Sequence, residues 1–165
     1  MDAGIDLRAR TVPSMSKWNS AEWADLRSGK TCPICLQGNP RDVVLELGAS
    51  YLTSTAAAPL RGYCCIVLKR HAVELHELAL SEAALFLKDV QRVGRALQEV
   101  TRAIKLNYEI HGNTVPHLHM HLYPRHAGDA FEGRPIDARA IGASPYANDE
   151  FSVFVTALRA RLADG

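Results

Sequence analysis

Apolar residues recur at three- and four-residue steps in two stretches of the chain, and this spacing predicts amphipathic helices. The longer helix is expected to begin at Ser81, with an apolar stripe of Leu87, Val90, Val93, Leu97, Val100 and Ile104. The other closes the chain, with a stripe of Phe151, Phe154, Val155, Leu158 and Leu162. Asn148 or Asp149 can cap this closing helix. A third, short helix is expected at residues 20–29, where Ser20 can cap it and Gly29 can end it.

Five further stretches have the two-residue period or the continuous apolar run of strands. The first places Val43, Leu45 and Leu47 on one face, and "SYLTST" and "GYCCIVLKR" follow it as an antiparallel meander. The other two, "LNYEI" and residues 117–122, come after the long helix. The chain is therefore expected to be α+β, with an antiparallel sheet of about five strands, a long helix on one face, and helices near both termini.

The chain divides, on this interpretation, into an N-terminal extension with its short helix (residues 1–29) and one domain that includes the closing helix (residues 30–165). A long polar connection, residues 128–149, could drape over a site.

Composition narrows the class of protein. The 165 residues are 47% apolar and 22% charged, which is typical of a globular domain with a real core. A net charge of +1 gives no field that would attract nucleic acid or an anionic membrane, so neither is expected as a partner. No run approaches 18 apolar residues and the N-terminus lacks the apolar centre of a signal peptide, so a cytoplasmic protein is expected. The four cysteines are then thiols or metal ligands rather than a disulfide framework.

The stretch "VPHLHMHLYPRH", residues 115–126, carries three histidines at alternate positions. In a strand, His117, His119 and His121 would share one face, about 6.5 to 7 Å apart along the chain. The apolar residues between them would face the long helix. Three aligned histidines are hard to explain by packing alone, so this row is the first candidate for chemistry.

Two chemical interpretations of the row remain open. A neutral imidazole can attack phosphorus if one ring nitrogen is free and the other is held by an acceptor. The central His119, with an imidazole on each side, suits such in-line attack. Alternatively, the three histidines could form a mononuclear metal centre, as in a metal-dependent oxidoreductase. Strand neighbours two residues apart reach a common ion only by leaning together.

The stretch "HGNTVPHLHMHLYPRHAGD" resembles the signature of the histidine triad (HIT) superfamily. Together with "GYCCIVLKRHAVELHEL" and the long helix, the arrangement is similar to the dinucleoside polyphosphate hydrolases of the fragile histidine triad branch and their bacterial relatives. The resemblance covers roughly residues 30–130. It implies that His119 takes up a nucleoside monophosphate as a phosphoramidate, that His121 contacts phosphate, and that His117 is a positioning residue. A histidine at 121, where the nucleotidyltransferase branch has glutamine, favours the hydrolase branches. The resemblance also implies a homodimer.

The same resemblance identifies substrate-binding positions and departures from the family pattern. Asn107 stands where the family has an amide that touches ribose or phosphate, and Thr114 where it has a hydroxyl near the bridging oxygen, with Asn113 beside it. Tyr63 stands where relatives usually have histidine, and Thr55 about where an acidic or amide residue commonly binds ribose.

"TCPICL" places Cys32 and Cys35 at a spacing that lets two thiolates bind one ion. The adjacent Cys64 and Cys65 point to opposite faces of a strand and cannot both complete the site, so histidine is the expected supplier. The resemblance implies His71 and His117 as the other ligands of a structural zinc; His76 is the alternative third ligand. A redox pair or free thiols are the other interpretations.

We therefore expect a nucleotide hydrolase or nucleotidyl transferase that cleaves a phosphoanhydride or phosphoramidate bond, as in a dinucleoside polyphosphate, through a nucleotidyl-His119 intermediate. Structural zinc is expected and an organic cofactor is not. The alternative is a non-catalytic, zinc-stabilised protein that binds nucleotides.

Overall fold

The computed structural model describes residues 16–137 and 144–164. Five antiparallel strands form one sheet in the order β1-β2-β3-β5-β4. The strands are β1 (Val43–Glu46), β2 (Ser50–Thr53), β3 (Cys64–Leu68), β4 (Lys105–Glu109) and β5 (His119–Arg125). This confirms the predicted α+β class and the five-stranded antiparallel sheet.

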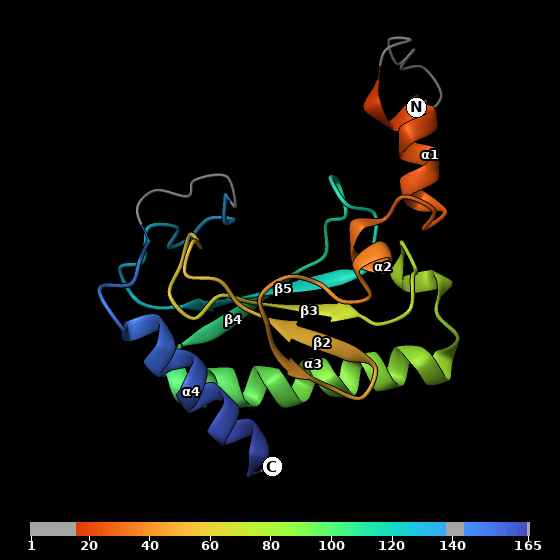
Figure 1. The fold of residues 1–165 in the computed structure, drawn as a ribbon. Helices are drawn as coiled ribbons and strands as arrows, with labels where there is room; N and C mark the ends of the chain where they lie inside the picture. The colour runs from red at the N-terminus through yellow and green to blue at the C-terminus, as the bar shows by residue number, and fades with distance from the viewer. Residues whose placement is uncertain (1–15, 138–143, 165) are drawn as a thin grey trace, which may run out of the picture.

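The long helix α3 (Leu80–Thr101) crosses one face of this sheet (Figure 1). Its buried side is formed by Phe86, Asp89, Val90, Val93, Gly94, Ala96 and Leu97. Two members of the predicted stripe lie elsewhere: Leu87 is 42% exposed and Ile104 is 69% exposed. The helix ends at Thr101 because Arg102 adopts a left-handed conformation as its C-cap, so Ile104 lies beyond the helix.

Of the other helices, α1 (Ala21–Arg27) and α4 (Glu150–Ala163) lie near the two ends of the described chain. Helix α4 packs against α3 and buries Leu158 and Leu162. Helix α1 is capped as predicted, since the Ser20 hydroxyl accepts a hydrogen bond from the Trp23 amide at 3.1 Å. Short helices α2 (Pro33–Gln37), η1 (Lys17–Asn19) and η2 (Leu75–Glu77) complete the set. In Figure 1, α1 and α2 lie on the side of the sheet opposite α3.

The predicted face of the first strand is right in part. Leu47 is buried in the core and Leu45 packs against it, but Val43 is 37% exposed and Val44 is buried instead. A register irregularity between Val43 and Leu45 shifts the alternation by one residue. Such a bulge turns successive side chains to the other face, and no two-residue pattern in the sequence reveals it.

Strand β5 has one face in the core and one face toward the site. Leu118, Met120 and Leu122 belong to the buried cluster under α3, as the alternation predicts. On the other face, Phe131 and Ile136 of the polar connection pack on Tyr123. Part of that connection, residues 138–143, lies outside the described residues, as do residues 1–15 of the N-terminal extension; the division at residue 29 stays a prediction. No helix among the described residues has the length and apolar character needed to cross a membrane.

Candidate active site

His119 and His121 line a pocket of about 300 Å³ on the sheet face opposite α3, called here the histidine pocket. Its lining residues are Ile34, Asp42, Thr53, Ser54, Thr55, Tyr63, Cys65, Val67, Val115, His119 and His121. They come from α2, β2, β3, β5 and the loops between strands. Its volume is near the lower limit for pockets that hold a small organic ligand.

His119 has one ring nitrogen engaged with the backbone. Its Nδ1 lies 2.6 Å from the carbonyl oxygen of His117, so Nδ1 carries the proton and donates it. The described part of the structure records no hydrogen bond to Nε2, which is therefore the nitrogen with a free lone pair. Burial, with a smaller effect of nearby His111, lowers the pKa of His119 and keeps the ring neutral. These are the requirements for a nucleophilic imidazole.

His121 lies beside His119, with ring centroids 4.7 Å apart in an edge-on arrangement. The Tyr63 hydroxyl lies 2.8 Å from His121 Nδ1. Burial and the neighbouring His119 and His111 lower the pKa of His121 to about 4. His111 is itself bonded to Glu109, with its Nε2 at 3.0 Å from the carboxylate. The pocket histidines are thus neutral hydrogen-bonding groups at pH 7 rather than a row of cations.

The rest of the histidine pocket is lined by both apolar and polar residues. Ile34 and Val67 come from α2 and β3, and Val115 comes from the loop before β5. Asp42 and Thr55 are polar residues of the lining. The backbone of Asp42 has a φ of 55°, a conformation that costs energy for a residue with a side chain.

A second group of side chains lies next to the pocket. One ligand atom each of Cys32, Cys35, His71 and His117, the Cys–His cluster, lie within 4.8 Å of one another. The Cys35 sulfur is 3.3 Å from His71 Nδ1 and 3.6 Å from His117 Nδ1. Burial and the adjacent Cys32 thiol raise the pKa of Cys35 to about 11. A cation held between the sulfurs would offset this penalty on the thiolate.

Both histidines of the Cys–His cluster are held by backbone carbonyls. His117 Nε2 donates to the Leu68 carbonyl at 2.7 Å, and His71 Nε2 donates to the Arg27 carbonyl at 2.9 Å. Each bond leaves Nδ1 as the unprotonated nitrogen that faces the sulfurs, which is the state a metal ligand requires. The residues present therefore fit a four-ligand Cys₂His₂ metal site.

His117 connects the two groups. It lies two residues before His119, at the entry to β5, and its side chain is fully buried. Its ring faces the cysteines, while its carbonyl oxygen accepts the His119 Nδ1 proton. The three histidines therefore do not act as one row: one belongs to the Cys–His cluster and two belong to the pocket. Among the described residues the only group of three or more potential metal ligands is the Cys–His cluster, so a centre on His119 and His121 has no support.

Three residues proposed from the resemblance lie outside the histidine pocket. Asn107 lies on β4, where its cross-strand partner is Tyr123 of β5. Its side-chain oxygen accepts a hydrogen bond from Lys105 Nζ at 3.1 Å. It lines a separate recess of about 500 Å³ along the β4 side of the sheet. Asn113 and Thr114 are exposed in the loop before β5 and are not among the pocket-lining residues.

Sequence reasoning missed Asp42, Ile34 and Val115 as pocket residues. Ile34 and Val115 lie inside the cysteine and histidine motifs without being their ligating or reactive residues, and Asp42 lies outside both; each enters the pocket from a loop or short helix whose position depends on the tertiary fold. Tyr63 was noticed only as a departure, although it directly contacts His121. The sequence feature that could have indicated this contact is the position of Tyr63 immediately before the apolar strand β3.

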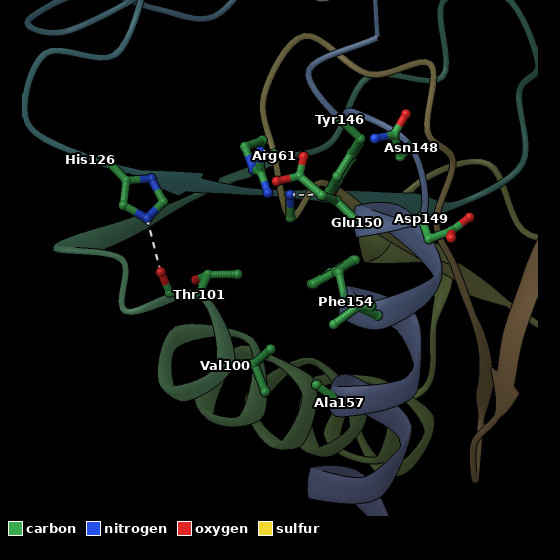
Figure 2. A pocket seen from close by; sticks show the side chains of 12 residues that line it. Arg61, Val100, Thr101, His126, Tyr146, Asn148, Asp149, Glu150, Phe154 and Ala157 are labelled. Atoms are coloured by element: carbon green, nitrogen blue, oxygen red, sulfur yellow. Dashed lines mark hydrogen bonds and ion pairs between the residues drawn. The ribbon is translucent and has the colours of Figure 1, made fainter.

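A larger cavity, of about 720 Å³, lies elsewhere (Figure 2). It lies between the end of α3 and the start of α4, with Val100, Phe154 and Ala157 on its apolar side. An Arg61–Glu150 ion pair at 2.8 Å lies at its edge. None of His117, His119 and His121 lines this larger cavity, so it is separate from the histidine pocket.

Residues 37–128 match the family model described as the HIT domain. The chain belongs to the HIT domain family. A curated relative, the bifunctional bis(5'-adenosyl)-triphosphatase/adenylylsulfatase FHIT of Arabidopsis thaliana, is 28% identical over 96 residues. That match covers 55% of this chain, and the chain spans about half (53%) of the relative's length.

Solved structures of HIT proteins agree with this family. A histidine triad protein from Bradyrhizobium japonicum is 31% identical, with a TM-score of 0.65, over 73% of this chain and 89% of that one. A zinc-bound histidine triad family protein from Mycobacterium smegmatis is 22% identical, with a TM-score of 0.56, over 88% and 94% of the two chains. The latter likeness concerns the fold alone.

Proposed function

We propose that this HIT protein is a nucleotide hydrolase or nucleotidyl transferase in which His119 Nε2 attacks the phosphorus of a nucleoside monophosphate group. One observation carries the proposal: His119 Nδ1 is bonded to the His117 carbonyl, which leaves the lone pair of Nε2 free in the histidine pocket. Membership of the HIT domain family and the name of the Arabidopsis relative support an adenylated substrate.

The reaction proceeds in two displacements. In the first, a bond forms between His119 Nε2 and phosphorus while the bond from phosphorus to the leaving group breaks. The leaving group departs with the electron pair and takes a proton from solvent. In the second, a water molecule attacks phosphorus, the N–P bond breaks, and the nucleoside monophosphate is released with return of neutral His119. An alcohol or second nucleotide in place of water would make the protein a transferase.

The pocket residues other than His119 bind and orient the substrate in this proposal. Ile34, Val67 and Val115 contact the base, and Asp42 accepts hydrogen bonds from the sugar hydroxyls. His121 contacts the phosphate oxygens, where donors stabilise the charge that spreads over them in the transition state. His117 positions His119 through its carbonyl. Asn107, Asn113 and Thr114 stay predicted substrate-binding residues, Asn107 for ribose or phosphate and Thr114 for the region of the bridging oxygen, with Asn113 beside it.

We also propose that the Cys–His cluster binds structural zinc through Cys32, Cys35, His71 and His117. The two sulfurs and two unprotonated Nδ1 atoms make the donor set that zinc prefers, and the zinc-bound Mycobacterium protein shares the fold. Zinc bound there would fix His117, and hence the carbonyl that orients His119.

The test of the enzymatic proposal uses diadenosine triphosphate and adenosine phosphoramidate as substrates. His119→Gln is expected to lower turnover at least about a thousand-fold, because the attacking atom is lost. His76→Gln, a substitution on the exposed helix η2, is the matched control and should keep full activity. Acid quench followed by mass spectrometry should detect a nucleotidyl group on His119. Tight binding of AMP without turnover of either compound would identify a non-catalytic binding protein instead.

A further inference from the structure

Tyr63 contacts His121 from a position that is fixed independently of it. Its amide donates to the Leu60 carbonyl at 3.4 Å, and its own carbonyl accepts from the Ser54 hydroxyl at 2.7 Å. Its ring packs against Tyr123, with centroids 5.0 Å apart. The phenol hydroxyl is therefore brought to His121 Nδ1 by the fold, at 2.8 Å, rather than reaching it as a flexible side chain.

The direction of this hydrogen bond follows from the groups around it. Burial raises the pKa of Tyr63 far above pH 7, so the phenol keeps its proton. The other neighbour of the phenol is Cys65, whose thiol also stays protonated because burial raises its pKa to about 12. A thiol is a weak acceptor and an unprotonated imidazole nitrogen is a strong one. The phenol O–H therefore donates to His121 Nδ1.

Within the part of the chain that the structure describes, the Tyr63 hydroxyl is the only recorded hydrogen-bond partner of a His121 ring nitrogen; the His111 ring lies beside it, with centroids 5.4 Å apart, and makes no recorded hydrogen bond to it. On β4 the cross-strand partner of His121 is Glu109, whose carboxylate is bonded to His111 in the described structure. On β3 the partner is Cys65, which is neutral. His119 and Tyr123, on β5 itself, present a neutral imidazole and a neutral phenol. The Tyr63 hydroxyl is thus the group that decides which nitrogen of His121 carries the proton.

We propose that Tyr63 is a positioning residue that holds His121 as the tautomer protonated on Nε2, so that His121 presents a neutral N–H donor to the phosphate group at His119. The phosphate part of this inference rests on the proposed function. A neutral donor differs from a protonated histidine because it does not need an acidic medium to keep its proton. Tyr63 stands where relatives usually have histidine, and in this chain the tyrosine positions His121 from that place.

The first test is nitrogen-15 NMR of histidine-labelled, ligand-free protein, which distinguishes protonated from unprotonated ring nitrogens. In the unsubstituted protein, His121 should carry its proton on Nε2. Tyr63→Phe keeps the ring and removes the hydroxyl, and should give a mixture of the two tautomers. Tyr123→Phe removes a neighbouring hydroxyl on the same face and should leave the tautomer unchanged. A proton found on Nδ1 in the unsubstituted protein, or no change in Tyr63→Phe, overturns the inference.

The second test measures AMP affinity by calorimetry. Tyr63→Phe should weaken AMP binding by about 3- to 10-fold, the usual effect of one hydrogen bond, whereas Tyr123→Phe should not. Tyr63→His, which restores an N–H donor, should recover part of the loss. Equal affinity in Tyr63→Phe and the unsubstituted protein overturns the phosphate role. Because neither readout requires turnover, a protein that binds AMP in this Tyr63-dependent way but hydrolyses nothing would overturn the proposed enzymatic function alone.

Discussion

At the scale of single residues, burial has opposite uses in the two histidine sites. In the histidine pocket it lowers the pKa values of His119 and His121, so that both rings are neutral, as the proposed nucleophile and phosphate donor require. In the Cys–His cluster it raises the pKa of Cys35, and the proposed zinc would offset the cost of the thiolate. The same desolvation therefore suits the proposed nucleophile in one site and the proposed metal binding in the other.

The lowered pKa of His121 predicts an acid-sensitive fold. The unfolded chain takes up a proton on this ring near pH 6.5, whereas the folded protein does so only near pH 4. The contribution of His121 to the free energy of unfolding should therefore be constant above about pH 7 and fall as the pH drops from there toward 4. His121 should account for a loss on the order of 1 to 3 kcal/mol.

Urea unfolding at a series of pH values measures how the free energy of unfolding depends on His121. In His121→Gln the fall in stability between pH 7 and pH 4 should be smaller, because one of the groups that links protons to unfolding is gone. The exposed His76→Gln should retain the original slope. An unchanged slope in His121→Gln would assign the acid sensitivity to other groups.

At the scale of elements, a buried carboxylate ties the β1–β2 hairpin to the long helix. Asp89 of α3 accepts hydrogen bonds from the Ala49 amide at 2.8 Å and the Ser50 hydroxyl at 2.7 Å. Ala49 lies in the turn between β1 and β2 and Ser50 is the first residue of β2, so one side chain sets how the hairpin meets α3. The apolar stripe of the helix predicted its packing against the sheet, but a single aspartate in that stripe gave no indication of its partners.

Removing this carboxylate should be costly. Asp89→Ala leaves two buried donors unpaired and is expected to destabilise the protein by about 2 to 4 kcal/mol in chemical denaturation. The matched control is Asp25→Ala, which breaks an exposed ion pair with Lys30 and should cost less than about 0.5 kcal/mol. Similar losses in the two variants would show that the buried bonds of Asp89 add nothing beyond a surface pair.

At the scale of the whole molecule, the Cys–His cluster joins segments that are distant in sequence. Its ligands come from α2, from the loop after β3, and from the entry to β5. His71 is also bonded to the Arg27 carbonyl at the end of α1. Metal bound there would hold the N-terminal helices against strand β5.

We expect elemental analysis to find one zinc per chain, lost in Cys35→Ser and kept in His76→Gln. Removal by a chelator should lower stability by about 4 kcal/mol relative to protein with free zinc a thousand-fold above its dissociation constant. Trypsin should then cleave faster at Arg27 or Lys30. Retention of zinc in Cys35→Ser, or its loss in His76→Gln, would contradict this ligand set.

The two edges of the sheet differ, and this bears on the expected homodimer. Along β1, Arg159 of α4 donates to the Val44 carbonyl at 2.8 Å, so this edge is partly covered. The other edge strand, β4, is flanked by the exposed Ile104 and Ile110. An open edge with apolar neighbours favours pairing with a second copy.

Analytical ultracentrifugation should therefore find a dimer. The double substitution Ile104→Lys and Ile110→Lys should give a monomer, because lysines at a sheet edge oppose pairing. Leu80→Lys, at the exposed start of α3, should remain dimeric. A dimer that persists in the double variant would exclude the β4 edge as the interface.

The sequence by itself determined the fold class, the three helices α1, α3 and α4, the strand that carries the histidines and the family, because each follows from local periodicity or a short motif. Only the tertiary structure decided that His117 turns to the cysteines while His119 and His121 face a pocket, since all three positions look alike in a two-residue pattern. It also decided that Asp42 and Tyr63 line that pocket. Contacts between segments far apart in sequence depend on how elements pack, on bulges and on loop paths, and these leave no periodic trace in the chain.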